Sequence, residues 1–193
     1  PTSSEIANKR LRCLRADLLD QRRGPVGADP ADLQRLAAAI SSYDEAAGAE
    51  FLTTHDHARR LGEDNIRRYL PIRELRIRIA PGDTLFELLA RVAAAAAVGC
   101  RITVSLPLST SRADVDWLDE RTEPWGGSIE FVDESDETLV ATIRQQQTDR
   151  IRYAARDRVP EIVQRTAAET GFFVAAAPVY HTGRIELLNY VQE

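Results

Sequence analysis

One stretch of the chain, residues 70–106, most constrains what it can fold into. Residues 75–79 alternate aliphatic side chains with arginines, which is the period of two that a pleated strand requires. A Pro-Gly-Asp turn at residues 81–83 precedes apolar residues at helical spacing, and residues 101–106 form a second apolar run. A strand, a crossover helix and another strand of this length predict a βαβ unit with parallel strands.

The ends of the crossover helix are signalled by its own residues. Thr84 and Glu87 have the spacing of a capping box, in which each side chain satisfies a free backbone donor near the other residue. Gly99 stands where the helix should end, because glycine takes the left-handed conformation without penalty. The alanine run at residues 93–97 predicts close packing of this helix against a sheet.

The rest of the chain supplies the other elements of a layered fold. Apolar residues at helical spacing predict two N-terminal helices, over residues 5–23 and 31–50. Asp157 is a candidate cap for a later helix. Further strands are predicted at residues 128–132, 149–153 and 172–176. Five strands separated by four helices predict an α/β fold: a Rossmann-like, doubly wound, mainly parallel five-stranded sheet.

Three regions follow from this assignment. We expect an N-terminal helical extension over residues 1–65, a Rossmann-like domain over residues 66–178 and a C-terminal flap strand within residues 179–193. Alternation of Ile185 and Leu187 predicts that the flap strand runs from Arg184 to Val191.

Polar side chains on the predicted strands are unusual for a parallel sheet that is covered on both faces, because such strands normally read as apolar runs. We therefore expect part of one face to meet solvent, the N-terminal helices or another domain. The polar positions are Arg76, Arg78, Arg101, Thr103, Ser105, Arg150 and Arg152.

Composition excludes some classes of function. The chain has 25 basic and 30 acidic residues, a net charge of −5, which disfavours nucleic acid as a partner. No apolar run reaches membrane-spanning length, and no signal peptide is present. The two cysteines, Cys13 and Cys100, are too few for a disulfide framework and favour a cytoplasmic setting. Because the chain starts at Pro1 without a methionine, we expect an excised or processed piece.

Ligands of doubly wound sheets bind beyond the carboxyl ends of the strands. In this chain, those ends carry few residues that could bind a ligand or take part in catalysis. Residues 80–83 contain one glycine, and residues 154–157 contain none. Asp133 and Glu134 favour the start of a helix capped by Ser135 over a Mg²⁺ site. The His-Asp-His sequence at residues 55–57 favours a surface loop over a metal site, because a third ligand is missing. We predict no catalytic, cofactor-binding or metal-binding residue.

Two sets of segments resemble known proteins. Residues 77–81, 88–99 and 102–107 resemble the opening of the cofactor-binding domain of the aldehyde dehydrogenase superfamily. Residues 62–71 and 184–193 resemble the C-terminal region of bacterial bifunctional proline utilisation proteins. The resemblance implies a parent chain with proline dehydrogenase and 1-pyrroline-5-carboxylate (L-glutamate γ-semialdehyde) dehydrogenase activities, which use FAD and NAD.

Departures from the family pattern imply that the fold is kept without its chemistry. The family's adenosine-ribose lysine falls at Leu106, and its glycine-rich turn falls on residues 154–157. Its general-base glutamate falls near Ala176 and Ala177. Its nucleophilic cysteine belongs to a separate catalytic domain, and neither cysteine of this chain matches it.

The resemblance suggests three hypotheses for function. The first is a structural and assembly module, whose final segment pairs with an aldehyde dehydrogenase domain of the parent chain or of its oligomer mate and covers the active site or the channel for the intermediate. Its expected interface residues are Arg184, Ile185, Leu187 and Tyr190. The second is a divergent NAD(P)-binding domain that retains a cofactor site. The third is an independent partner-binding α/β domain.

Overall fold

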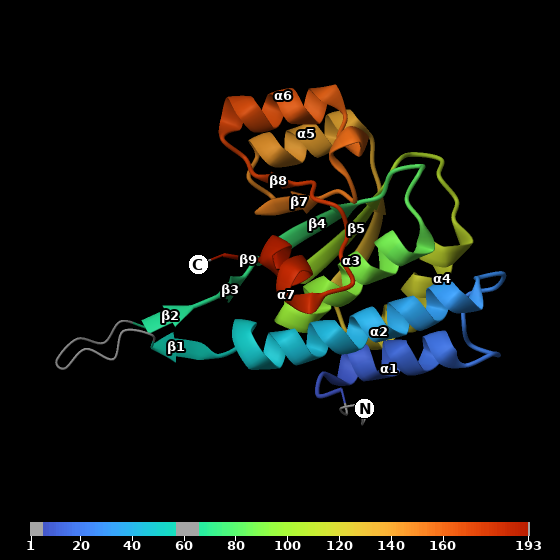
Figure 1. The fold of residues 1–193 in the computed structure, drawn as a ribbon. Helices are drawn as coiled ribbons and strands as arrows, with labels where there is room; N and C mark the ends of the chain where they lie inside the picture. Colours follow the sequence, from blue (N-terminus) through green and yellow to red (C-terminus); the bar gives the residue numbers. More distant parts are fainter. Residues whose placement is uncertain (1–5, 57–65, 193) are drawn as a thin grey trace.

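A computed structural model of the protein describes residues 6–56 and 66–192. Its main helices form two layers around a central sheet, with a third layer outside one of them (Figure 1). They are α1 (Lys9–Leu19), α2 (Pro30–Ala46), α3 (Leu85–Val98), α4 (Ala113–Thr122), α5 (Asp136–Arg144) and α6 (Glu161–Thr170). In Figure 1, α5 and α6 lie above the sheet, α3 and α4 lie below it, and α2 and α1 lie farther out beneath α3.

The central sheet is the predicted one. Its five parallel strands have the order β6-β5-β4-β7-β8. They are β4 (Glu74–Arg78), β5 (Arg101–Leu106), β6 (Ile129–Asp133), β7 (Arg150–Arg152) and β8 (Val174–Ala175). On β4, Ile77 lies opposite Val104 on one side and opposite Arg152 on the other. The strand order runs outward in both directions from the β4–β7 pair, which confirms a doubly wound sheet.

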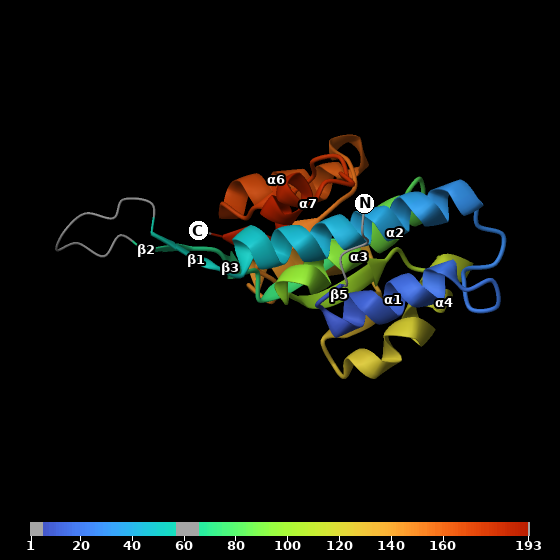
Figure 2. The ribbon, with the colours of Figure 1, turned by 60° about the horizontal axis from the view of Figure 1, so that its bottom comes forward.

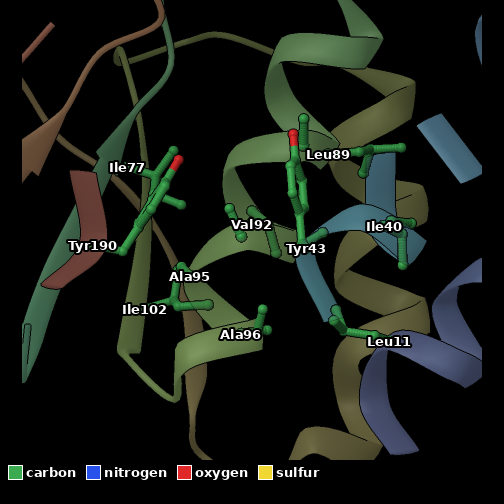
Figure 3. Close-up of a cluster of buried hydrophobic side chains, with 14 of the residues drawn as sticks. Leu11, Ile40, Tyr43, Ile77, Leu89, Val92, Ala95, Ala96, Ile102 and Tyr190 are labelled. Atoms are coloured by element: carbon green, nitrogen blue, oxygen red, sulfur yellow. The ribbon is translucent and has the colours of Figure 1, made fainter. Parts of the chain in front are cut away.

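Helix α3 is the centre of the main core. Thr84 and Glu87 form the predicted capping box, and Gly99 ends the helix with a φ of 88°. Each alanine from 93 to 97 is at most 3% exposed, because the sheet packs on one side of the helix and α2 on the other. Figure 3 shows Val92 and Ala95 of α3 between Ile77 of the sheet and Tyr43 of α2. The predicted role of the alanine run in packing is confirmed.

The first N-terminal helix is shorter than predicted, whereas α2 and the π-helical turn η1 (Ala47–Phe51) together span the predicted second helix. Both helices belong to the same core as the sheet. Asn8 caps α1, and Asp29 caps α2 by accepting a bond from the backbone N–H of Ala31. Leu11 and Ile40, on α1 and α2, are fully buried in one cluster with residues of α3 and β4. Figure 2 shows both helices stacked along α3. The domain boundaries at residues 65 and 178 stay predictions.

The N-terminal helices do not meet the polar face of the sheet. Arg76 and Arg78 instead pair with acids on the α5 side, at 2.6 Å to Glu134 and 2.8 Å to Asp136. Arg152 points to the opposite face, since it shares the register position of Ile77. Of the three alternatives given for this face, the N-terminal helices are therefore not what covers it, and ion pairs within the chain account for Arg76 and Arg78.

The predicted strand from Arg184 to Val191 is largely wrong. The segment folds as two helical turns, α7 (Gly183–Glu186) and a 3₁₀ turn, η4 (Leu187–Tyr190), and ends in the two-residue strand β9 (Val191–Gln192). The buried residues Gly183, Glu186, Leu187 and Tyr190 follow a helical spacing of three and four, not an alternation.

Burial of Glu186 explains this conformation. Its carboxylate accepts bonds from Arg152 at 2.9 Å, from the Tyr190 hydroxyl at 2.7 Å and from the backbone N–H of Tyr180 at 2.8 Å. A buried charge is stable only with such partners. The helical turn is what brings Glu186 and Tyr190 onto the side that faces Arg152.

One predicted cap also differs. Asp157 lies in a 3₁₀ turn, η3 (Arg156–Arg158), and Pro160 takes the position before α6. No side chain caps α6, and the backbone oxygen of Pro160 accepts from the N–H groups of Val163 and Gln164.

Candidate functional site

In a doubly wound sheet the ligand crevice lies where the strand order reverses, which here is beyond the carboxyl ends of β4 and β7. The loops after these two strands meet through charged side chains. Arg158, from the loop after β7, donates to Asp83 at 2.7 Å and to Glu87 at 2.8 Å. Both acids come from the loop after β4 and the first turn of α3. We call Asp83, Glu87, Arg91 and Arg158 the crevice cluster.

Arg91 is the buried member of the crevice cluster. It lies on α3, is fully buried, and pairs with Asp83, whose side chain is also fully buried. Arg91 also donates to the backbone oxygen of Arg78 at 2.9 Å, at the end of β4. Burial lowers the pKa of Arg91, and the charge of Asp83 opposes that shift. Ion pairs between side chains of the cluster thereby hold the two loops of the crevice together.

Two of the backbone donors that could hold a phosphate are also engaged. At the start of α3, the Glu87 N–H donates to the Thr84 hydroxyl at 3.2 Å, and the Thr84 N–H donates to the Glu87 carboxylate at 2.8 Å. Burial raises the pKa of Glu87, but the bonds from Arg158 and Thr84 outweigh it and lower the pKa. A carboxylate therefore stands at the helix N-terminus, where a bound phosphate would otherwise be stabilised.

Of the other acids considered at strand ends, Glu134 binds side chains of the sheet and Asp133 does not. Glu134 is buried and accepts from Arg76 at 2.6 Å and from Ser105 at 2.5 Å. Asp133 is exposed at the end of β6, and Ser135 caps α5 as predicted. Among the described residues, no group of three His, Cys, Asp or Glu side chains is placed to hold a metal ion.

The His-Asp-His sequence falls partly in a strand. His55 lies in β1 (Thr54–Asp56), and its Nε2 is 2.8 Å from the backbone oxygen of Glu50. His57 lies outside the described residues, so the interpretation of this sequence as a loop stays a prediction there.

A second candidate site is an arm that sequence reasoning missed. Strands β1 and β2 (Ile66–Arg68) pair antiparallel beyond the end of α2, away from the main body in both views (Figures 1 and 2). Next to them, β3 (Leu70–Pro71) pairs antiparallel with β9, so the end of the chain lies at the base of the arm. Ile66 and Leu70 are apolar, but Arg67 and Arg68 between them leave no alternation from which a strand could be predicted.

A cavity of about 530 Å³ lies at the base of the arm. Its polar lining comes from α2, from the π-helical turn η1 (Ala47–Phe51), from the arm and from α7, and includes Glu45, His55, Arg67 and Arg184. Arg184 pairs with Glu50 of η1 at 2.7 Å. The C-terminal segment is thus joined to η1, next to the arm, by an ion pair at the surface.

The four predicted interface residues divide into two pairs. Leu187 and Tyr190 have no exposed surface, because they fill the core against α3. The side chain of Arg184 is 75% exposed, and Ile185 is 50% exposed. Apolar exposure continues on the neighbouring elements, with Ile66, Leu70 and Leu188 at 62%, 41% and 53%. We call Ile66, Leu70, Ile185 and Leu188 the exposed apolar set.

Comparisons with known proteins bear on the fold. Protein-family models give no match, and a search of curated proteins gives none either. Among solved structures, the chain is similar to succinic semialdehyde dehydrogenase from Streptococcus pyogenes, solved with NADP⁺ as the cofactor, with a TM-score of 0.64 and 14% identity over 88% of this chain. The fold is shared with aldehyde dehydrogenases.

Two further structures carry a proline utilisation name. Proline Utilization A from Corynebacterium freiburgense matches 86% of this chain with 22% identity and a TM-score of 0.51. A PutA protein from Anabaena variabilis matches 86% of this chain with 18% identity and a TM-score of 0.61. The chain spans 14% of the first, 38% of the second and 40% of the streptococcal enzyme. None of the helices in the described ranges has the length and apolar character needed to cross a membrane.

Proposed function

We propose that this chain is a non-catalytic C-terminal domain of a proline-catabolic 1-pyrroline-5-carboxylate dehydrogenase. In that setting it supports assembly, or covers the active site or channel, during oxidation of proline to glutamate. The similarity to two proteins named for proline utilisation supports the metabolic setting. The small share of the C. freiburgense protein that the chain spans, 14%, supports a domain within a much longer parent.

The crevice cluster is the observation that carries the non-catalytic part of the proposal. Arg158 and Asp83 hold each other at 2.7 Å across the gap between the two loops. A dinucleotide would have to displace this bond and leave the buried Arg91 and Asp83 with altered partners, which is costly for buried charges. The cluster favours a role in shape over a role in cofactor binding.

The arm and the exposed apolar set carry the assembly part. Ile66 lies on β2 and Leu70 lies on β3, four residues farther along the chain, and both are exposed. Exposed strands with apolar side chains pair readily with a strand of another chain, which adds backbone hydrogen bonds to apolar burial. An aldehyde dehydrogenase domain of the parent chain, or of its oligomer mate, is the proposed partner.

Substitution on the arm, in the full-length parent, tests the assembly role. Deleting residues 184–193 would remove Glu186, Leu187 and Tyr190 from the core, so loss of folding would obscure the result. We expect Ile66→Asp together with Leu70→Asp to lower the mass of the assembly measured by light scattering, or to release free intermediate during coupled turnover. Ile162→Asp is the matched control, because Ile162 is 38% exposed on α6, far from the arm. Unchanged mass and unchanged coupling in the arm variant would refute the proposal.

A further inference from the structure

A groove of about 820 Å³ runs along α1, on the side of the sheet away from the crevice. It lies at the carboxyl end of α3, next to Gly99, whereas the crevice lies at the amino end of that helix. Its apolar lining is mostly small, which leaves room for another chain: Ala16, Ala96, Ala97 and Val98 line it, together with Trp125 and the 61% exposed Leu52.

The charge of this groove is opposite to that of the molecule. Its charged lining residues are Lys9, Arg10, Arg23 and Arg121 against Asp17, although the whole chain has a net charge of −5. A basic rim around apolar walls is complementary to an occupant that carries both carboxylates and aliphatic side chains.

The cations at the amino end of α1 are available and positioned. Arg10 donates to the backbone oxygen of Trp125 at 3.1 Å, and its guanidinium lies 5.9 Å from the centre of the Trp125 ring. Neither Arg10 nor Lys9 forms an ion pair with a carboxylate of the described residues. Arg10 is therefore held in place by an aromatic side chain and a carbonyl, which leave its charge uncompensated.

A second cation marks the other end of the groove. Arg23 forms an ion pair with Asp17 at 3.1 Å near the end of α1, and its side chain is 63% exposed, so it remains open to a second carboxylate. Residues 9 and 17 are eight positions apart, and a helix rises about 1.5 Å per residue, so the two ends are separated by about 12 Å. An extended chain advances about 3.3 Å per residue and covers that distance with about four residues.

We propose that this groove binds an extended acidic peptide segment of a partner protein. Acidic side chains about four residues apart would meet Lys9 and Arg10 at one end and Arg23 at the other, with small aliphatic residues against Ala97 and Trp125 between them. A fatty acid carries a single carboxylate and leaves one end of the groove unmatched. This inference is independent of the proposed role in proline catabolism.

Selection from a phage-displayed library of random heptapeptides on the 193-residue chain tests the proposal. We expect the selected pool to be enriched in Asp or Glu at two positions about four apart, with aliphatic residues between them. Binding of a selected peptide should weaken at least tenfold in Lys9→Glu/Arg10→Glu and with rising salt. Arg144→Glu/Arg165→Glu has the same change in charge at exposed sites on α5 and α6, and should bind like the wild type.

A footprint on the wild-type chain avoids any dependence on variant folding. Cys13 is exposed and lines the groove, whereas Cys100 is buried, and burial raises its pKa to about 12. The selected peptide should therefore slow the reaction of Cys13 with a maleimide. The proposal is overturned if no pool rises above background, if the pool is basic or neutral, if Cys13 is not protected, or if dodecanoate protects Cys13 equally well.

Discussion

Asp83 has the most partners of any acid in the crevice cluster. Its side chain is fully buried and accepts from Arg91, from Arg158 at 2.7 Å and from the backbone N–H of Ala80 at 3.1 Å. Arg91 has no exposed surface either, and Asp83 is the carboxylate that pairs with it. The stability of two loops and one helix thus depends on a single side chain.

Replacing Asp83 with alanine is expected to lower the free energy of unfolding by about 3–5 kcal/mol, because the buried Arg91 loses its charge partner. Urea denaturation followed by circular dichroism measures this change. Asp133→Ala removes an exposed aspartate and should change stability by less than about 0.5 kcal/mol. A loss in Asp83→Ala no larger than that of the control would contradict the structural role of the cluster.

Among the elements, α7 and α2 approach closely enough to exclude any side chain at Gly183. Its N–H donates to the Ser42 hydroxyl at 2.9 Å. A Cβ atom there would overlap the backbone oxygen of Ser42 and lie 2.7 Å from the Cβ of Ala46. This contact, with the buried Glu186 three residues later, fixes the C-terminal segment on the body of the protein.

Gly183→Ala is expected to destabilise the protein by about 1–3 kcal/mol, because the added methyl group forces two packed helices apart. Gly48 has open space around its Cβ position in the π-helical turn. Gly48→Ala should instead stabilise by about 0.5–1 kcal/mol, since alanine loses less entropy in a helix. Thermal unfolding of both variants measures the difference, and equal melting temperatures would show that α7 does not pack as described.

At the start of α3, stability should depend on acid pH through Glu87. Its folded pKa is lowered from 4.5, so its contribution is present above pH 4.5 and is lost as the pH falls through the folded value. Glu87→Gln should cost about 1 kcal/mol at pH 7. The difference in the free energy of unfolding between Glu87→Gln and the wild type should decrease at acid pH. Urea titrations at several pH values measure this difference, with Glu123→Gln as an exposed control. A difference that is constant with pH would contradict the contacts assigned to Glu87.

At the scale of the whole molecule, local signals were enough to predict the sheet and its helices. Period-two strands, the capping box at Thr84 and the terminal Gly99 all act over a few residues, and the structure confirms them. The crevice cluster could not be predicted, because Arg158 and Asp83 are 75 positions apart and the residues around them do not indicate that they pair. Buried ion pairs depend on tertiary contacts that periodicity does not encode.

The C-terminal segment illustrates the same limit. A glutamate at position 186 reads as a solvated residue, so Ile185 and Leu187 suggest an alternating strand. Glu186 is instead buried against Arg152, which lies 34 positions away on β7, and a helical turn places it there. The exposed Arg184 and Ile185 keep the predicted place at the surface, whereas Leu187 and Tyr190 turn inward.

Calorimetric titration of the 193-residue chain with NAD⁺ and with NADP⁺ tests most directly whether the filled crevice excludes a dinucleotide. Asp83, Arg91 and Arg158 satisfy one another there, so we expect no heat of binding and a Kd weaker than about 1 mM for both cofactors. A Kd in the micromolar range for either cofactor would contradict a non-catalytic domain and would favour a divergent NAD(P)-binding domain.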